Sequence, residues 1–183
     1  MMYSIVYLII HSIFAGTSIL VPILFVVYLF KVNLPLINQS ILIRAVNCTL
    51  LLGSVLFIAG IIVETFIAYY SGSEYEQYTF TNRIVGPYWF YFWLSGIGIL
   101  ALLPQILWVK KFRRTIVSSI IIVSSWCLLY LLSKIILVMQ PDPGWHIEIM
   151  PGFIYYVKQG VIYIVVVGLM YIVLYKKMLL SES

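Results

Sequence analysis

Four ionisable residues lie within apolar stretches of this sequence and could carry chemistry there: His11, Glu64, Lys134 and Lys158. A charge near the centre of a bilayer costs at least about 2.5–3.5 kcal/mol, so such groups usually face a protein interior, pair with one another or line an aqueous path. We expect Glu64 to pair with Lys134 or Lys158. The pair would form a pocket that holds a quinone head group or passes protons, or it would only fix the register of the helices. The sequence leaves both interpretations open.

The elements that must position these residues are apolar helices. Of the 183 residues, 63% are hydrophobic and 9% are charged, and the mean hydropathy is +1.09. A helix of roughly 20 apolar residues crosses about 30 Å of hydrocarbon. Five such spans are predicted, at about 3–30, 45–70, 87–109, 115–139 and 153–175. We therefore expect an all-α integral membrane protein whose residues 1–183 form a single transmembrane helical-bundle domain of about five helices.

The distribution of cations predicts the orientation, because Lys and Arg are retained in cytoplasmic loops. Most cations fall in three regions of one predicted side, residues 31–44, 110–114 and 176–177. The loops predicted on the other side, 71–86 and 140–152, contain a single Lys or Arg, which is Arg83. The N-terminus is therefore expected outside and the C-terminus in the cytoplasm. Since the net charge of +5 lies at helix ends, it indicates a lipid membrane and no nucleic acid as partner.

The outer side of the predicted bundle supplies the remaining candidate residues. Tyr69 and Tyr70 follow Glu64 at the outer end of its span, and we include them with His11, Glu64, Lys134 and Lys158 as candidates for a quinone or proton path. Anchoring at the membrane surface is their usual role. Candidates for contacts with partner proteins are Glu74, Glu76, Arg83, Trp145 and His146. The pattern predicts no metal bound by this chain, and no catalytic residue can be named.

The stretch from Val63 to Arg114 contains a series of short motifs. It begins with VETFIAYYSGSEYEQYTFTNRIVGPYWFYFW and ends with LLPQILWVKKFRR. These motifs resemble the NrfD-like membrane proteins of the polysulfide-reductase family, and especially the quinol-oxidising membrane subunits of alternative complex III. The matching positions are Glu64, the helix end at 68–72, Tyr75-Glu76, the helix start at 86–89, and 104–110. The similarity covers about residues 10 to 126.

The resemblance implies a membrane subunit of a respiratory complex in the bacterial cytoplasmic (inner) membrane. Other membrane and peripheral subunits would be its partners, and they would carry the haem or iron-sulfur centres. This chain alone would hold none of these centres; a quinone is the one cofactor that it could contact. Family members have eight or more spans, so this chain resembles their later part. We therefore expect a non-catalytic or accessory subunit of a quinol-oxidising complex. The alternatives are a non-redox membrane anchor or scaffold subunit of a cell-envelope assembly, or a small proton-coupled transporter.

Overall fold

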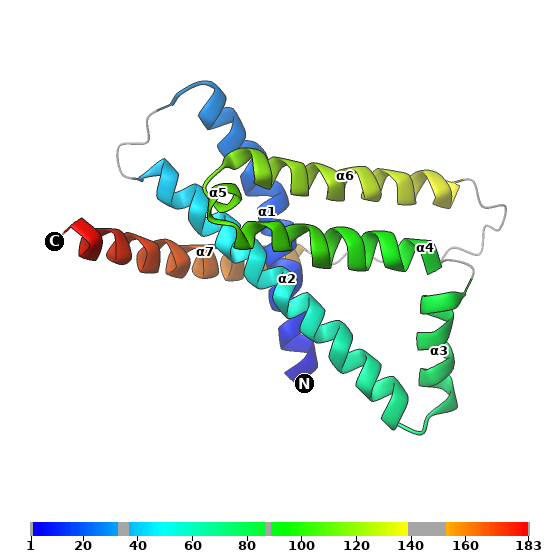
Figure 1. Cartoon of the computed structure of the whole chain (residues 1–183). Coiled ribbons are helices and arrows are strands. Elements are labelled where there is room, and N and C mark those ends of the chain that lie inside the picture. Colours follow the sequence, from blue (N-terminus) through cyan, green and yellow to red (C-terminus); the bar gives the residue numbers. More distant parts are fainter. Residues whose placement is uncertain (1, 33–36, 87–88, 139–152, 183) are drawn as a thin grey trace.

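The computed structural model describes residues 2–32, 37–86, 89–138 and 153–182, and these residues are almost entirely helical (Figure 1). No strand occurs among them. In chain order the helices are α1 (Met2–Leu29), α2 (Gln39–Tyr70), α3 (Glu74–Val85), α4 (Trp89–Tyr91), η1 (Phe92–Leu102), η2 (Leu103–Trp108), α5 (Lys110–Arg113), α6 (Ile116–Val138) and α7 (Phe153–Glu182). Of these, η1 is a π-helix and η2 a 3₁₀-helix.

Three of these helices are long and apolar enough to cross a membrane. They cover Ile5–Leu29, Gln39–Tyr70 and Tyr155–Leu180, and shorter apolar stretches occupy Phe92–Trp108 and Ile116–Leu129. The predicted all-α class is therefore confirmed, and the three long apolar helices fit a membrane protein. The number of crossings and their direction stay predictions.

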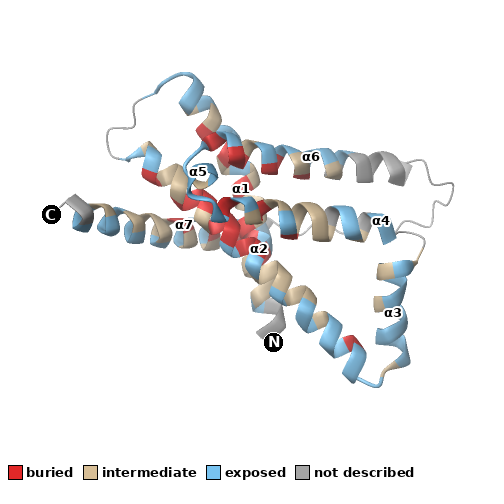
Figure 2. Ribbon diagram, viewed as in Figure 1, coloured by how far each residue is buried: buried red, intermediate tan, exposed pale blue. Residues whose placement is uncertain are grey.

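The core lies where α1 crosses α2 (Figure 2). Ile13 of α1, Leu50 of α2, Leu107 of η2 and Ile122 of α6 are almost completely buried there. α7 packs against both α1 and α2, while α6 packs against α1 and η1. The two long helices approach closely because Gly53 has no side chain: a Cβ at this position would lie 2.6 Å from Cγ2 of Ile13. The crossing of α1 and α2 is thus the centre on which η2, α6 and α7 pack.

Asn47 joins α2 to the start of α6 from inside this core. Its Nδ2 donates hydrogen bonds to the carbonyl oxygens of Arg113 (3.0 Å) and Thr115 (3.2 Å), and the Ser119 hydroxyl donates to its Oδ1 (2.6 Å). Asn47 is completely buried. A buried amide is stable only when its donors and acceptors have partners. These three bonds meet that need and fix the turn before α6 against α2.

The chain around Pro104 departs from α-helical geometry, and neighbouring side chains compensate. Proline has no N–H to donate, and here η1 gives way to η2. Nε2 of Gln105 donates to the carbonyl of Ala101 (3.1 Å) and to the Ser54 hydroxyl (2.9 Å). Nε1 of Trp126 donates to the carbonyl of Ile99 (3.3 Å). Carbonyl groups of an apolar helix are thus satisfied by side chains where the regular pattern is interrupted.

The observed helix ends differ from the predicted ones at two places. α2 begins at Gln39 instead of about residue 45, because Oδ1 of Asn38 accepts from the N–H groups of Ser40 (3.1 Å) and Ile41 (3.4 Å). Such a cap satisfies donors that the first helical turn leaves without partners. α7 continues past residue 175 to Glu182.

Residues 71–86 were expected to form a loop, and that expectation is wrong for most of the segment. Glu74–Val85 form the helix α3, whose N-cap Ser73 accepts a hydrogen bond from the N–H of Glu76 (3.4 Å). Gly72, with φ of +65°, makes the turn between α2 and α3. A serine followed by Glu three residues later is a known helix-start pattern. α3 therefore turns back from the C-terminal end of α2, and the two helices form a V in Figure 1.

Candidate functional site around Glu64

A cavity of about 530 Å³ lies between α1, α2, α3 and η1, and we call it the Glu64 cavity. Its lining residues are Tyr7 and Ile10 of α1; Phe57, Gly60, Ile61 and Glu64 of α2; Thr79, Asn82 and Arg83 of α3; and Phe92 and Gly96 of η1. Isoleucine, phenylalanine and glycine form most of the wall, and the polar groups come from Tyr7, Glu64 and α3. The volume lies within the range of about 300–1,000 Å³ that is typical of small-molecule sites.

Glu64 is held at this cavity by contacts to both of its carboxylate oxygens. The Tyr7 hydroxyl donates a hydrogen bond to Oε1, and Nη1 of Arg83 donates to Oε2 at 3.0 Å. The Glu64 side chain is 23% exposed and that of Arg83 47%. Tyr7 comes from α1 and Arg83 from α3, so three elements meet at one carboxylate.

The hairpin of α2 and α3 explains how Arg83 reaches Glu64, 19 residues earlier in the chain. Arg83 lies in the last turn of α3, where a cation interacts favourably with the helix dipole. Nε1 of Trp93 in η1 donates to the carbonyl of Ile84 at 3.1 Å, which ties the same end of α3 to η1. Both of these contacts are polar. None of the described residues of α3 is buried, so apolar packing adds little to them.

A second cavity of about 270 Å³ lies between α2 and α3 and shares Glu64, Thr79 and Arg83 with the first. Its other lining residues are Ile67, Ala68, Tyr75, Glu76 and Phe80. The Glu64–Arg83 pair therefore faces two cavities.

The structure brings only some of the predicted candidates together. Glu64 and Arg83 form the site, and Arg83 is its ion-pair partner, so the pairing expected with Lys158 is wrong: Lys158 is exposed on α7. The side chain of Lys134 on α6 lies outside the described part of the chain, as do Trp145 and His146.

Of the remaining candidates in the described part of the chain, one lines a cavity, and this is Glu76. His11 is exposed and stacks on the ring of Tyr7, with centroids 6.1 Å apart. Tyr69 and Tyr70 are each 74% exposed and contact one another edge to face. Glu74 and Glu76 are exposed on the first turn of α3, and Glu76 also lines the second cavity.

Sequence reasoning missed Tyr7, Thr79 and Asn82 as residues of the site. Tyr7 lies four residues before His11, so a helix places the two on one face. Because His11 was a predicted candidate, its helix face already indicated Tyr7. Thr79 and Asn82 belong to α3, whose start is indicated by Ser73 and Glu76. Because residues 71–86 were predicted to be a loop, Thr79 and Asn82 were not considered as residues of a helix next to Glu64.

Among the described residues, no three His, Cys, Asp or Glu side chains lie close enough to hold a metal ion. Comparison of the chain with protein-family models, with curated proteins and with solved structures gave no match in any of the three.

Proposed function

We propose that this chain is a multi-pass membrane subunit of a quinol-linked electron-transfer complex in the bacterial inner membrane. It would cross the bilayer about five times, with its N-terminus outside and its C-terminus in the cytoplasm. The Glu64 cavity would receive the quinol head group. The observation that carries the proposal is a carboxylate, held by Tyr7 and Arg83, in the wall of a mostly apolar cavity of about 530 Å³.

The cavity has the two kinds of surface that a quinol head group requires. Ile10, Phe57 and Phe92 offer apolar and aromatic contacts to its ring. Glu64 offers an acceptor for one of its hydroxyl groups. Oxidation of a quinol to a quinone releases two protons and two electrons. One proton would pass to Glu64 as general base and the second to water, and the two electrons would pass to haem or iron-sulfur centres on a partner subunit.

Replacing Glu64 with Gln tests this function in the intact complex. The amide keeps the size of the side chain but has no carboxylate to take a proton, so we expect quinol-dependent reduction of the redox centres to fall by about 10²-fold or more. The complex would be isolated through a tag on this chain, and its composition and absorbance spectrum would be recorded. Absence of any redox subunit from the isolated complex would overturn the proposal, as would full activity of the variant.

A non-redox scaffold subunit is the second candidate, and one observation favours it. The Glu64–Arg83 pair joins α3 to α2, and none of the described residues of α3 is buried, so the pair has a clear structural task. On this alternative Glu64→Gln would weaken assembly, whereas the matched change Arg83→Lys keeps a cation opposite the Glu64 carboxylate and should leave assembly intact. Loss of turnover in a complex of normal composition separates the first function from the second.

A further inference from the structure

A pair of arginines lies where the start of α2 meets α5. Arg44 stands in the second turn of α2, and Arg113 is the last residue of α5. Both are half-buried, whereas Lys110, Lys111 and Arg114 beside Arg113 are exposed. Cations that lose part of their contact with water need a partner more than exposed ones do. We call the place between the two half-buried arginines the Arg44–Arg113 site.

Two observations bring these arginines together. Arg44, Asn47 and Cys48 share one face of α2, because residues three and four positions apart on a helix are neighbours. From this face Nδ2 of Asn47 donates to the carbonyl oxygen of Arg113 at 3.0 Å. The positive charges of Arg44 and Arg113 also both act on the Cys48 thiol, between Asn47 and the next turn of the helix. The two cations therefore lie over the same stretch of α2.

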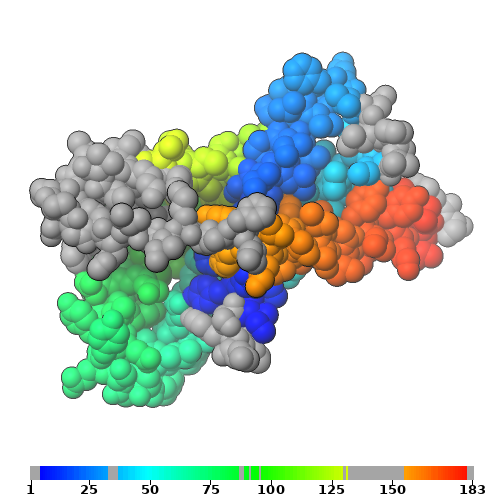
Figure 3. Space-filling view, turned by 180° about the vertical axis from the view of Figure 1, so that it is seen from behind, coloured from blue at the N-terminus to red at the C-terminus, as the bar shows by residue number. Residues whose placement is uncertain are grey.

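α7 packs against another side of this stretch. Leu42 and Tyr171 of α7 line a common hollow, and two residues turn a helix by about 200°, so Leu42 and Arg44 point in nearly opposite directions. Figure 3 shows the molecule from behind, where α7 (orange to red) lies in front of the start of α2 (cyan). Past Tyr171 α7 continues to Glu182, about 16 Å further at 1.5 Å per residue. α7 and its charged end thus lie outside the Arg44–Arg113 site.

No acidic side chain pairs with either arginine in the part of the chain that the structure describes. The ion pair found there joins Arg83 to Glu64, which lies about 30 Å from Arg44 along α2 at 1.5 Å per residue. The other acidic residues are Glu74 and Glu76 in α3, Glu182 at the end of α7, and Asp142 and Glu148 outside the described residues. Like charges without a counter-charge repel one another, and partial burial strengthens the repulsion. An anion between the two guanidinium groups would remove it.

The surroundings of the site favour an anion that belongs to a lipid. Residues 110–114 separate two apolar helical stretches, Phe92–Trp108 and Ile116–Leu129, so they lie at the edge of the hydrocarbon layer, where lipid phosphates begin. Trp108 and Phe112, next to the cations, are 62% and 43% exposed. Tryptophan at such a boundary contacts lipid head groups. Clustered cations at the end of a membrane helix attract anionic lipids.

We propose that Arg44 and Arg113 bind the phosphate group of an anionic phospholipid, with Lys110 as a third contact. A guanidinium group can donate two parallel hydrogen bonds to a phosphate. Lys110 stands three residues before Arg113, on the same side of the α5 turn, whereas Lys111 is turned away from Arg113 by about 160°. The site requires a membrane but does not depend on the quinol function of the Glu64 cavity.

Arg44→Gln and Arg113→Gln test the proposal, because each removes one guanidinium group. The matched control is Lys111→Gln, which removes an exposed cation from the far side of the same turn. The full chain would be purified in a neutral detergent and titrated with phosphatidylglycerol or phosphatidylethanolamine of identical acyl chains. Native mass spectrometry would count the bound lipids.

We expect the native chain to bind phosphatidylglycerol in preference to phosphatidylethanolamine. Each arginine change should weaken the binding of phosphatidylglycerol by about fivefold, which corresponds to about 1 kcal/mol per cation, and Lys111→Gln by less than about twofold. Absence of a preference in the native chain would overturn the proposal. Equal effects of Lys111→Gln and Arg113→Gln would do the same, because diffuse surface charge would then attract the lipid.

Thermal unfolding separates a lipid site from a purely structural role of the arginines. Without lipid, Arg44→Gln should be at least as stable as the native chain, since it removes one of two cations that repel each other. Phosphatidylglycerol should then raise the unfolding temperature of the native chain more than that of the variant. Lower stability of Arg44→Gln without lipid would show that Arg44 has a structural partner, and this would overturn the proposal.

Two further outcomes would identify a different occupant. If inorganic phosphate, at the concentration of the lipid, raised the unfolding temperature of the native chain as much as phosphatidylglycerol does, the ligand would be a free anion. If Arg113→Gln released a partner subunit from the isolated complex while lipid binding stayed unchanged, the site would be a protein-docking surface. Either result would overturn the assignment to a lipid.

Discussion

The two halves of α2 belong to very different environments. Apart from Ala68, all the buried residues of this helix lie between Ile41 and Ser54. From Val55 to Tyr70 the helix is mostly half-buried or exposed, and it lines the Glu64 cavity. Figure 2 shows the contrast as a change from red to tan and pale blue along one continuous helix. Apolar composition alone therefore does not decide which half of a membrane helix becomes core.

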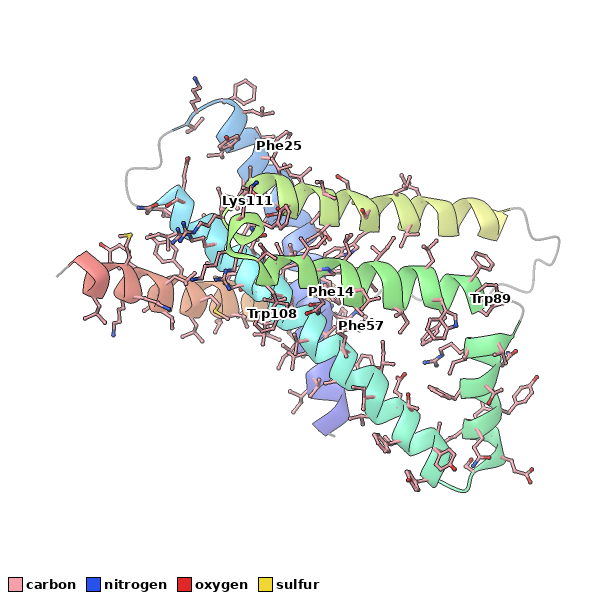
Figure 4. All side chains as sticks on the ribbon, viewed as in Figure 1. Phe14, Phe25, Phe57, Trp89, Trp108 and Lys111 are labelled. Carbon is pink, nitrogen blue, oxygen red and sulfur yellow. The ribbon has the colours of Figure 1, made fainter. Side chains whose placement is uncertain are left out.

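What separates the halves is how closely the neighbouring elements pack around each. The first half contacts α5, η2 and α7, and the crossing with α1 lies at its end, where Phe14 packs edge to face on Phe57 (Figure 4) and on Trp126. The second half faces α1, α3 and η1 across the Glu64 cavity, and none of the described residues of α3 is buried. Polar side chains in the first half therefore fix the structure, whereas Glu64 in the second half faces cavities.

The largest effect on stability is expected from Asn47→Ala in the buried half. The change leaves the Arg113 and Thr115 carbonyls and the Ser119 hydroxyl without this partner, so we expect a loss of about 3 kcal/mol in the free energy of unfolding. Denaturation in detergent, followed by circular dichroism, measures it. Asn38→Ala, at the exposed cap of α2, should cost only about 1 kcal/mol. Equal losses for the two variants would contradict the contrast between core and surface.

The two glycines of α2 provide a matched pair across the halves. Gly53→Ala forces a Cβ against Ile13 at 2.6 Å, and such overpacking should cost about 2 kcal/mol. Gly60→Ala places its Cβ in open space and should stabilise the helix by up to about 1 kcal/mol. The same unfolding measurement applies to both. The opposite order of stability would show that the second half is as tightly packed as the first.

Some of this contrast could be predicted from the sequence. Glu64 was identified because a carboxylate in an apolar stretch needs a partner or a cavity. Arg83 was not assigned to it, because the partner depends on a hairpin between α2 and α3 whose helix-start residues, Ser73 and Glu76, were read as loop. Tyr7 could not be assigned, since its contact depends on how α1 crosses α2. The role of Asn47 was also hidden, because two of its partners are backbone carbonyls, which no residue type reveals.

Thr49→Val sharpens the comparison within the core itself. Thr49 is fully buried, and its hydroxyl has no hydrogen-bond partner in the part of the chain that the structure describes. Removing an unsatisfied hydroxyl should raise the free energy of unfolding by about 1 kcal/mol. The control is Thr17→Val, where the buried hydroxyl donates to Tyr163, and this change should destabilise the protein. Destabilisation by Thr49→Val would indicate that its hydroxyl has a partner after all.

Arg83→Gln should have the smallest effect on global stability and a clear local one. The Arg83 side chain is 47% exposed, so the loss of its ion pair should lower the free energy of unfolding by less than about 1 kcal/mol. α3, however, is tied to α2 by this pair and has no buried residue among those described. Its amide hydrogens should therefore exchange faster, as measured by hydrogen–deuterium exchange and mass spectrometry over Glu74–Val85.

Lys111→Gln is the control for Arg83→Gln, because Lys111 is an exposed cation on α5, outside the hairpin (Figure 4). It should change neither the stability nor the exchange of α3. If Arg83→Gln left the exchange of α3 unchanged, the tie from Trp93 to Ile84 would suffice to hold the helix. If it instead unfolded the whole protein at lower denaturant, the second half of α2 would be coupled to the core. A local effect alone means that one ion pair controls how α3 borders the Glu64 cavity.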